Sequence, residues 1–326
     1  MNKKLVAVAV AASLALPMVS AHAVDVADKK LEVYGKLHLN LGKYDEAGST
    51  NDNWRLSSFA SRLGFKGNVK LDDGLTGTYK METEVAIESG TTTFAGRNTY
   101  VGLKGNFGEV RLGRHDSPLK MAQGKFDQFG DTTGDLKHAG SQDGENRNTN
   151  AITYLGKFDK LAVNVQLIPG EGNGTTAGQG LADDSSIAVS YKAGPVYVAV
   201  AQDTHDKKKG TETAMTRLVA TYKVSGMQFG LLSQSGVEKS TTSDKKEDWL
   251  GLSFNVKMGS KNKLKAQYIT VEDKAVSQTK GTQTSIGFDH KLGKKGTMYA
   301  MYNTFKQTGG TTTDNKSVSV GYILKF

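Results

Sequence analysis

The sequence predicts an all-β protein, a transmembrane β-barrel of sixteen antiparallel strands with its third long loop folded inward. Three observations lead to this fold class. Apolar and polar residues alternate along most of the chain, the first residues have the pattern of an export signal, and the alternating segments are even in number. An even number is what closure of an antiparallel barrel requires.

The first 23 residues are expected to be a cleaved signal peptide. Lys3 and Lys4 give a positive start, residues 5–16 are apolar, and residues 21–23 form an Ala-His-Ala cleavage site. An uncleaved membrane anchor is the alternative, but the apolar run is shorter than the roughly 20 residues of a spanning helix. The mature chain then forms a single domain over residues 24–326 and contains no transmembrane helix.

Composition also favours a barrel with a wet interior. The hydrophobic fraction is 37%, which is low for a globular core of this size, and there are 38 Gly and no Cys. Such a barrel needs apolar side chains only on its outer face. The net charge is +9, or +7 without Lys3 and Lys4, which would attract anions or lipopolysaccharide phosphates. An export signal argues against nucleic acid as the partner.

The alternation is clearest at the end of the chain. Val318, Val320 and Tyr322 share one face with Leu324 and Phe326, whereas Ser317, Ser319, Gly321 and Lys325 share the other. The same period of two predicts strands over residues 31–44, 54–71, 75–88, 97–105, 109–115, 147–156, 161–168, 185–193, 196–204, 213–223, 227–235, 248–258, 263–272, 282–291, 297–306 and 315–326.

Connections alternate between tight turns and long polar stretches. This asymmetry is typical of outer-membrane barrels, whose turns lie in the periplasm and whose loops lie outside. Aromatic residues near strand ends are expected to form interfacial girdles, although strand preference alone would also place them there: Tyr34, Tyr44, Tyr100, Phe107, Tyr154, Phe158, Tyr191, Tyr222 and Phe326.

One long segment interrupts the series of predicted strands. About 30 residues from Asp116 to Glu145 lack strand alternation, and a loop of this length in a compact domain is usually functional or disordered. It contains apolar residues that could anchor it, namely Leu119, Met121, Phe126, Phe129 and Leu136. Folded into the lumen, it would narrow the channel. The alternative is a mobile external loop.

Four motifs resemble those of the Gram-negative general porins, especially the neisserial type and related proteobacterial porins. Residues 111–118 (RLGRHDSP) resemble the signature that leads into the family's third loop. Residues 61–67 (SRLGFKG), 97–105 (RNTYVGLKG) and 147–154 (RNTNAITY) resemble three of its strands. The resemblance covers the mature chain, and its specificity comes from the four motifs together.

The resemblance implies a homotrimer of sixteen-stranded pores, each constricted by its third loop. It implies a basic wall that faces acidic loop residues, with Arg62, Arg97 and Arg147 on the wall and Arg114 at the junction. The acidic candidates are Asp116, Asp127 and Asp131. It also implies that Phe326, with Tyr322 on the same face, is the signal that the barrel-assembly machinery reads.

Strand parity supports part of this wall independently. Arg62 lies opposite in parity to Leu63 and Phe65, and Lys36 and Lys80 lie on the polar faces of their strands. An arginine facing lipid at mid-membrane would cost roughly 2–4 kcal/mol, which favours the lumen. The alternative is that Arg62 and Arg97 sit near the interface and bind lipid phosphate.

The predicted function is a general diffusion channel for ions and small hydrophilic solutes, weakly anion-preferring, with outer-membrane lipid and lipopolysaccharide as partners. No cofactor or metal is expected. An enzyme is disfavoured because the five histidines after residue 23 are scattered: His38, His115, His138, His205 and His290. The residues leave two further functions open, a phosphate- or oligosaccharide-selective channel and a non-conducting adhesive barrel. Tyr34 is the one aromatic residue expected to point inward.

Overall fold

The computed structural model describes residues 30–48, 53–89, 95–171, 180–205, 211–240, 244–274, 279–309 and 312–326. The predicted signal peptide over residues 1–23 lies outside this part of the chain, and so do parts of the predicted long polar loops. No helix in the described ranges is long and apolar enough to cross a membrane.

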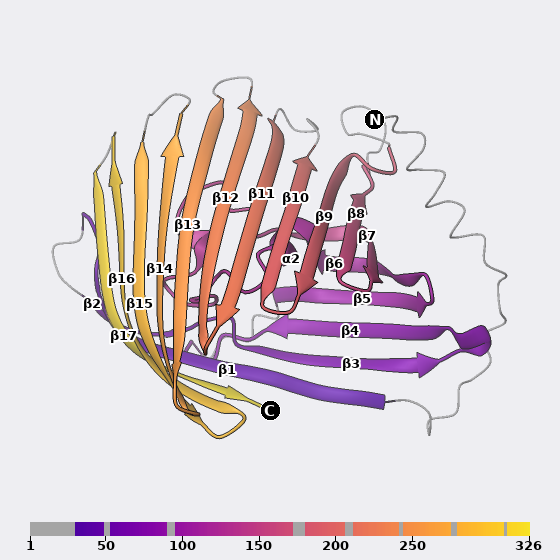
Figure 1. Ribbon diagram of the computed structural model, residues 1–326, viewed down its shortest axis with the longest axis horizontal. Coiled ribbons are helices and arrows are strands. Elements are labelled where there is room, and N and C mark those ends of the chain that lie inside the picture. Colours follow the sequence, from indigo (N-terminus) through magenta and orange to yellow (C-terminus); the bar gives the residue numbers. More distant parts are fainter. Residues whose placement is uncertain are drawn as a thin grey trace.

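The described strands form one closed antiparallel sheet in which neighbours in sequence are neighbours in space (Figure 1). The barrel closes where β17 pairs with β1, for example Leu39 with Tyr322. The strands are β1 (Lys30–Asp45), β2 (Asn53–Ser58), β3 (Arg62–Lys70), β4 (Thr76–Glu84), β5 (Ala95–Gly105), β6 (Gly108–Asp116), β7 (Arg147–Phe158), β8 (Leu161–Ile168), β9 (Asp184–Ala193), β10 (Val196–His205), β11 (Thr211–Val224), β12 (Met227–Ser240), β13 (Lys245–Met258), β14 (Asn262–Asp273), β15 (Lys280–Leu292), β16 (Gly296–Thr308) and β17 (Thr313–Lys325).

β2 and β3 are two halves of one crossing, so the barrel has the predicted sixteen strands. Both halves pair with β1, with Leu39 opposite Ser58 and Lys36 opposite Arg62. The interruption covers residues 59–61, where Ala60 has a φ of 49°. The Oγ of Ser61 accepts the N–H of His38 at 2.9 Å and so takes the place of a backbone acceptor at the interruption.

The predicted strands are confirmed, but three of them differ in extent: the strand predicted over residues 54–71 is interrupted, β12 runs to Ser240 and β4 is shorter than predicted. The alternation predicted a strand up to residue 88, but β4 ends at Glu84. Glu84 pairs with Arg62, the first residue of β3, and a hydrogen bond of 2.9 Å from the Val85 N–H to the Ser61 carbonyl follows this pair. β4 therefore ends beside the interruption between β2 and β3.

Tight hairpins join the strands at one end of the barrel. Between β11 and β12, Ser225 and Gly226 have φ values of 46° and 79°, the left-handed pair that matches the twist of a two-residue hairpin. The tight connections follow β3, β5, β7, β9, β11, β13 and β15. By the usual asymmetry of such barrels, these strands descend to the periplasm and β17 ends there too.

Side chains alternate between an apolar outer face and a polar inner face. Five of the aromatic residues expected in the girdles are exposed, most of them beside tight turns: Phe107, Phe158, Tyr191, Tyr222 and Phe326. The girdle expectation is wrong for Tyr44 and Tyr100, whereas Tyr34 points inward, which was the other placement expected for it. Tyr34 donates to Glu82, and Tyr44 donates to buried Asn40, both at the inner face. The ring of Tyr100 packs at a tilt against His115, which is buried.

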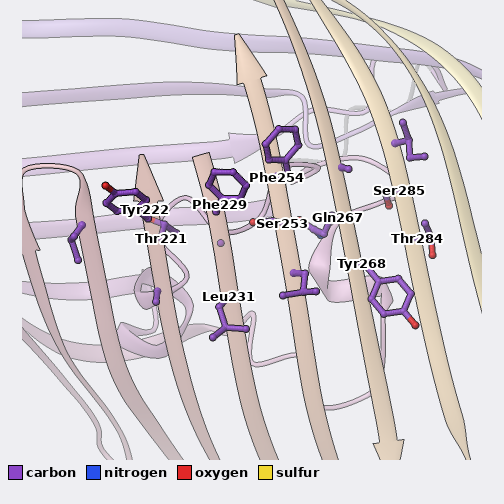
Figure 2. A pocket seen from close by; sticks show the side chains of 16 residues that line it. Thr221, Tyr222, Phe229, Leu231, Ser253, Phe254, Gln267, Tyr268, Thr284 and Ser285 are labelled. Atoms are coloured by element: carbon purple, nitrogen blue, oxygen red, sulfur yellow. The ribbon is translucent and has the colours of Figure 1, made fainter. Parts of the chain in front are cut away.

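The outer face carries a shallow apolar hollow of about 780 Å³ over β10–β15 (Figure 2). Its walls are mainly hydrocarbon and aromatic side chains, including Tyr222, Phe254 and Tyr268. A face of this kind suits lipid contact, because every strand presents its apolar residues there. The polar groups lie on the other side of the same strands, inside the barrel.

Candidate functional site

The segment between β6 and β7, residues 117–146, lies inside the barrel. It begins with α2 (Pro118–Ala122), which Ser117 caps by accepting the N–H of Lys120 at 3.1 Å. It later forms a 3₁₀ turn, η3 (Leu136–His138). In Figure 1, α2 is seen behind β9 and β10, the strands against which it packs.

Hydrogen bonds tie this loop to the polar face of the β9–β15 wall. Such bonds recur along the whole loop, so it is docked rather than suspended. Leu119 N–H donates to Ser186 at 3.1 Å, Tyr197 to the Ala122 carbonyl at 3.0 Å, Gln228 to the Lys125 carbonyl at 2.8 Å, Gln128 N–H to Gln267 at 2.9 Å, and Gln283 to the Asp135 carbonyl at 3.2 Å.

Apolar packing holds the loop on the same wall. Four of the five predicted anchors, Leu119, Phe126, Phe129 and Leu136, have no exposed surface. Phe126 and Leu136 pack in one cluster with wall residues from β11 to β14, namely Val219, Leu232, Trp249, Ile269 and Val271. Fully burying such a side chain contributes about 1.5–3 kcal/mol. The loop therefore makes a small hydrophobic core inside the barrel.

Arg217 is the main polar anchor of the loop. It lies on β11 with no exposed surface, and its Nη1 contacts Glu145 Oε1 at 2.9 Å. The same guanidinium donates to the carbonyls of Leu119 and Asp143. Its Nε donates to Gln234 at 2.7 Å. One wall residue thus holds both ends of the loop.

Glu247 on β13 is a second anchor. Its carboxylate accepts the N–H of Ser141 at 3.2 Å and the N–H of Gln142 at 3.0 Å. Trp249 donates to the same carboxylate at 3.0 Å. Buried carboxylates are tolerated only with such a set of donors. The returning half of the loop is therefore fixed to the wall before it enters β7.

The opposite wall carries the predicted basic residues. Asp131, at the loop tip, contacts Lys36 Nζ at 2.6 Å and Arg62 Nη2 at 2.7 Å. These three side chains come from β1, β3 and the loop, and they form direct ion pairs inside the barrel. Fixed charges that line a channel in this way can filter ions.

Glu82 links the remaining members of this wall. Arg97 Nε contacts its carboxylate at 2.8 Å and Lys80 Nζ at 3.2 Å, while Tyr34 donates to it at 2.7 Å. Arg97 also contacts Glu84 at 2.6 Å. Neither carboxylate was among the site residues that the sequence predicted. Their spacing with Lys80 along β4 was the signal that could have identified them.

Arg147 and Asp116 form a further pair where β6 and β7 leave the sheet. Their distance is 2.9 Å, and Lys120 lies 3.3 Å from the same oxygen of Asp116. Asn98 donates to Asp116 at 2.8 Å and accepts from Arg147 at 3.0 Å. Asp116 thus lies at the end of β6, in the wall, rather than on the loop as predicted.

A bulge brings Arg97 and Asn98 to the same side. On β4 the register runs from Met81 to Thr83, while on β5 it runs from Thr99 to Gly96. The extra residue lets two consecutive side chains of β5 reach inner-face partners. This placement disfavours the alternative in which Arg97 binds lipid phosphate, because its guanidinium is buried against Glu82 and Glu84.

Two predicted site residues do not join the cluster. Arg114 shares the parity of exposed Leu112, and its Nε has no hydrogen-bond partner in the described part of the chain. Asp127 accepts the N–H groups of Phe129 at 2.8 Å and Leu136 at 3.3 Å, so it shapes the loop itself. Burial raises the pKa of Asp127, and neighbouring Asp135 adds to this shift.

The charge of Asp131 is expected to persist to low pH. Burial raises the pKa of this carboxyl, but Lys36 and Arg62 outweigh that effect and lower it to about 2. Because the folded-state value lies below the usual value of about 3.9, the ion pairs stabilise the loop fully above about pH 4. That stabilisation is lost as the pH falls through about 2.

The corresponding prediction concerns ion selectivity measured from reversal potentials in a salt gradient. The difference in selectivity between the wild type and Asp131→Asn should stay constant from pH 8 to about pH 4 and fall to about half as the pH reaches 2. A difference that already disappears near pH 5 would show that the two cations do not hold this carboxylate. Asp131→Asn serves as the control for every other titrating group.

Sequence comparison places this chain among known barrels. Residues 6–310 match the family described as Gram-negative porin. The major outer membrane protein P.IB of Neisseria gonorrhoeae is 26% identical over 178 residues, which cover 54% of this chain and 50% of that protein. A monosaccharide porin of a Halomonas species is 28% identical over 239 residues, covering 66% and 63%. The chain thus spans half to just under two thirds of the length of these relatives.

Solved structures share the fold. The anion-selective porin from Comamonas acidovorans has a TM-score of 0.79 at 23% identity, covering 91% of this chain and 100% of that one. The trimer form of OmpT from Vibrio cholerae has a TM-score of 0.74 at 18% identity, covering 91% and 99%. The closed barrel, the docked loop and the family match agree, and the chain belongs to the Gram-negative porins of the outer membrane.

Proposed function

We propose that this protein is a general diffusion porin with a weak preference for anions. The observation that carries the proposal is the charge balance of the constriction. Five cations, Lys36, Arg62, Lys80, Arg97 and Arg147, face four carboxylates, Glu82, Glu84, Asp116 and Asp131. A near-balanced set filters weakly, and its small positive excess favours anions.

The deciding experiment is single-channel recording in planar bilayers. We expect large ohmic steps in KCl and a reversal potential that shows a weak anion preference. Absence of any conductance would overturn the porin proposal. Strong cation preference would overturn the anion preference and would point to the four carboxylates as the controlling charge.

Assembly as a homotrimer is part of the proposal, supported by the trimer form of the OmpT neighbour. Channels that insert together and close in three equal current steps would support a trimer. Channels that always close in a single step would contradict it. Outer-membrane lipid, lipopolysaccharide and the assembly machinery are the other proposed partners. Phe326 exchanges two backbone hydrogen bonds of 3.2 Å with Gly35 across the barrel seam. The role of Tyr322 and Phe326 as an assembly signal stays a prediction.

A monosaccharide-selective channel is the second candidate. Its specific support is that Tyr44 and Tyr100 point inward together with Tyr34, whereas the sequence predicted this for Tyr34 alone. Sugar binding in the pore would lower KCl conductance when a monosaccharide is added at millimolar concentration. Unchanged conductance would leave general diffusion as the function.

A further inference from the structure

Eight lysines occupy one repeated position in the barrel. Each of the eight descending strands carries a lysine one residue before its tight turn or, in β17, one residue before the end of the chain. Lys and Arg together make up 42 of 326 residues, or about one in eight, so eight occurrences in eight strands are not a product of composition. We call these residues the lysine collar: Lys70, Lys104, Lys157, Lys192, Lys223, Lys257, Lys291 and Lys325.

Backbone hydrogen bonds show that the positions are structurally equivalent. In five of the strands, the N–H of the collar lysine donates to a carbonyl at the preceding tight turn, at 2.8–3.1 Å. These bonds run from Lys192 to Lys160, Lys223 to Pro195, Lys257 to Gly226, Lys291 to Lys261, and Lys325 to Lys295. The lysines therefore lie at one level, at the periplasmic end of the wall.

The collar lies on the inner face. Lys223 pairs with Gln228, which reaches the loop carbonyl of Lys125 inside the barrel. Lys325 pairs with Lys36, which contacts Asp131. The residue after each collar lysine has the opposite parity, and Phe158, Met258 and Leu292 are exposed on the outer face. The ammonium groups thus surround the mouth of the channel, while their neighbours face lipid.

The collar charges are not neutralised. All eight lysines are exposed, and none of them makes an ion pair with a described residue. Their partners across the hairpins are mainly neutral: Thr76, Ala162, Tyr197, Gln228 and Thr297. Glu109, opposite Lys104, is bound by Arg111 at 2.8 Å.

Lysines at the other end of the barrel differ. Lys274 contacts Asp248 at 2.6 Å, Lys280 contacts Glu272 at 3.1 Å, and Lys316 contacts Asp314 at 3.4 Å. The positive excess is therefore concentrated at the periplasmic mouth. A group of like charges that no protein carboxylate pairs with raises the local concentration of ions of opposite charge.

We propose that the lysine collar binds small multivalent anions, such as oligophosphates or polycarboxylates, at the periplasmic mouth of the channel. This inference rests on the proposed channel function. Collar lysines on alternate strands are about 10 Å apart, because neighbouring strands are about 4.8 Å apart. This spacing is close to the Debye length of about 10 Å at 0.1 M salt, so neighbouring charges act together on one polyanion. Inorganic monovalent anions gain little from such a ring.

Lipid phosphate is the other source of this chemistry. The inner-face parity of the collar favours free anions, because the strand residues that face lipid are the apolar neighbours. Recordings in bilayers of neutral phosphatidylcholine remove anionic headgroups from the test. An effect of the collar that appears only when phosphatidylglycerol is added would assign the lysines to lipid and overturn the proposal.

The experiment uses tripolyphosphate as the probe, added to one chamber at a time in 0.1 M KCl. The orientation of the channel in the bilayer is determined with Lys306→Cys, which introduces a single thiol into a chain that has no cysteine. This thiol is biotinylated, and streptavidin is added to one chamber at a time. The chamber from which streptavidin changes the current is the one that faces the outer end of the barrel. The test variant is the triple change Lys223→Gln, Lys257→Gln and Lys291→Gln. The matched control is Lys274→Gln, Lys280→Gln and Lys316→Gln, which removes the same charge at the other end.

We expect tripolyphosphate to reduce the wild-type current from the periplasmic side, with about tenfold weaker apparent affinity in the test variant and little change in the control. In 1 M KCl, where the Debye length is about 3 Å, the block should disappear. Equal block from both sides, or equal loss in both variants, would overturn the collar.

Failure of the proposed channel function can be distinguished from failure of the proposed anion site. Absence of KCl conductance in the wild type would refute the porin proposal without addressing the collar. In that case, isothermal titration of detergent-solubilised protein with tripolyphosphate still reads the site. Binding that the test variant weakens and the control retains would support the collar, and binding that neither triple variant changes would overturn it.

Discussion

Replacing Asp131 with asparagine is expected to make the channel clearly anion-selective. The change removes the one loop carboxylate that faces Lys36 and Arg62 and leaves both cations directed into the lumen. A unit charge about 4 Å from a permeating ion is worth about 1 kcal/mol in water. The chloride-to-potassium permeability ratio, measured from reversal potentials at 0.1 M KCl, should therefore rise about fivefold.

Asp127→Asn is the matched control for this change. Burial raises the pKa of Asp127 to about 7, so the two variants remove the same charge in recordings made above about pH 8. Asp127 binds backbone N–H groups within the loop instead of the basic wall. Its permeability ratio should stay near that of the wild type. If both variants shift selectivity equally, the net charge of the loop decides, and the contact geometry of Asp131 does not.

Replacing Arg217 with methionine is expected to release the loop. Glu145 would lose its buried cation, and two loop carbonyls, those of Leu119 and Asp143, would lose their donor. Breaking a buried ion pair by removing one partner costs about 3–5 kcal/mol. We expect larger and noisier single-channel currents, together with tryptic cleavage at exposed Lys125, which the docked loop should resist.

Arg55→Met is the control for this loss of charge. Arg55 is partly exposed and pairs with Glu46 at the surface, where an ion pair contributes about 0–1 kcal/mol. Adding Glu145→Gln to Arg217→Met should bring the current noise part of the way back to the wild-type level, because it removes the unpaired buried charge. Quiet wild-type currents in Arg217→Met alone would show that the apolar packing of the loop is sufficient.

The barrel could be predicted from the sequence because its strands and turns are determined by residues that are close together in the sequence. Alternation such as that from Val318 to Tyr322 records which side of the sheet meets lipid, and tight turns record where strands reverse. Parity also placed Lys36, Arg62 and Lys80 on the inner face, where the structure has them. These predictions need no knowledge of distant contacts, because the bilayer imposes the same pattern on every strand.

Parity fails where the backbone is irregular or where the loop packs. The bulge in β5 turns both Arg97 and Asn98 inward, and alternation alone allows only one of them. Trp249 and Ile269 are apolar residues on the inner face, because Phe126 and Leu136 of the loop cover them. The role of Arg217 depends on the position of the loop, which the sequence does not specify.

The small hydrophobic core under the loop divides the interior of the barrel into two halves with different constraints. On β9–β14 the inner residues are fixed by close packing against the loop, so most substitutions there would lower stability. On β1–β7 the inner residues include the charged side chains of the site, among them Arg62, Arg97 and Arg147. Natural variation can therefore retune which solutes pass by exchanging charges on the second half, while the scaffold that positions the loop stays intact.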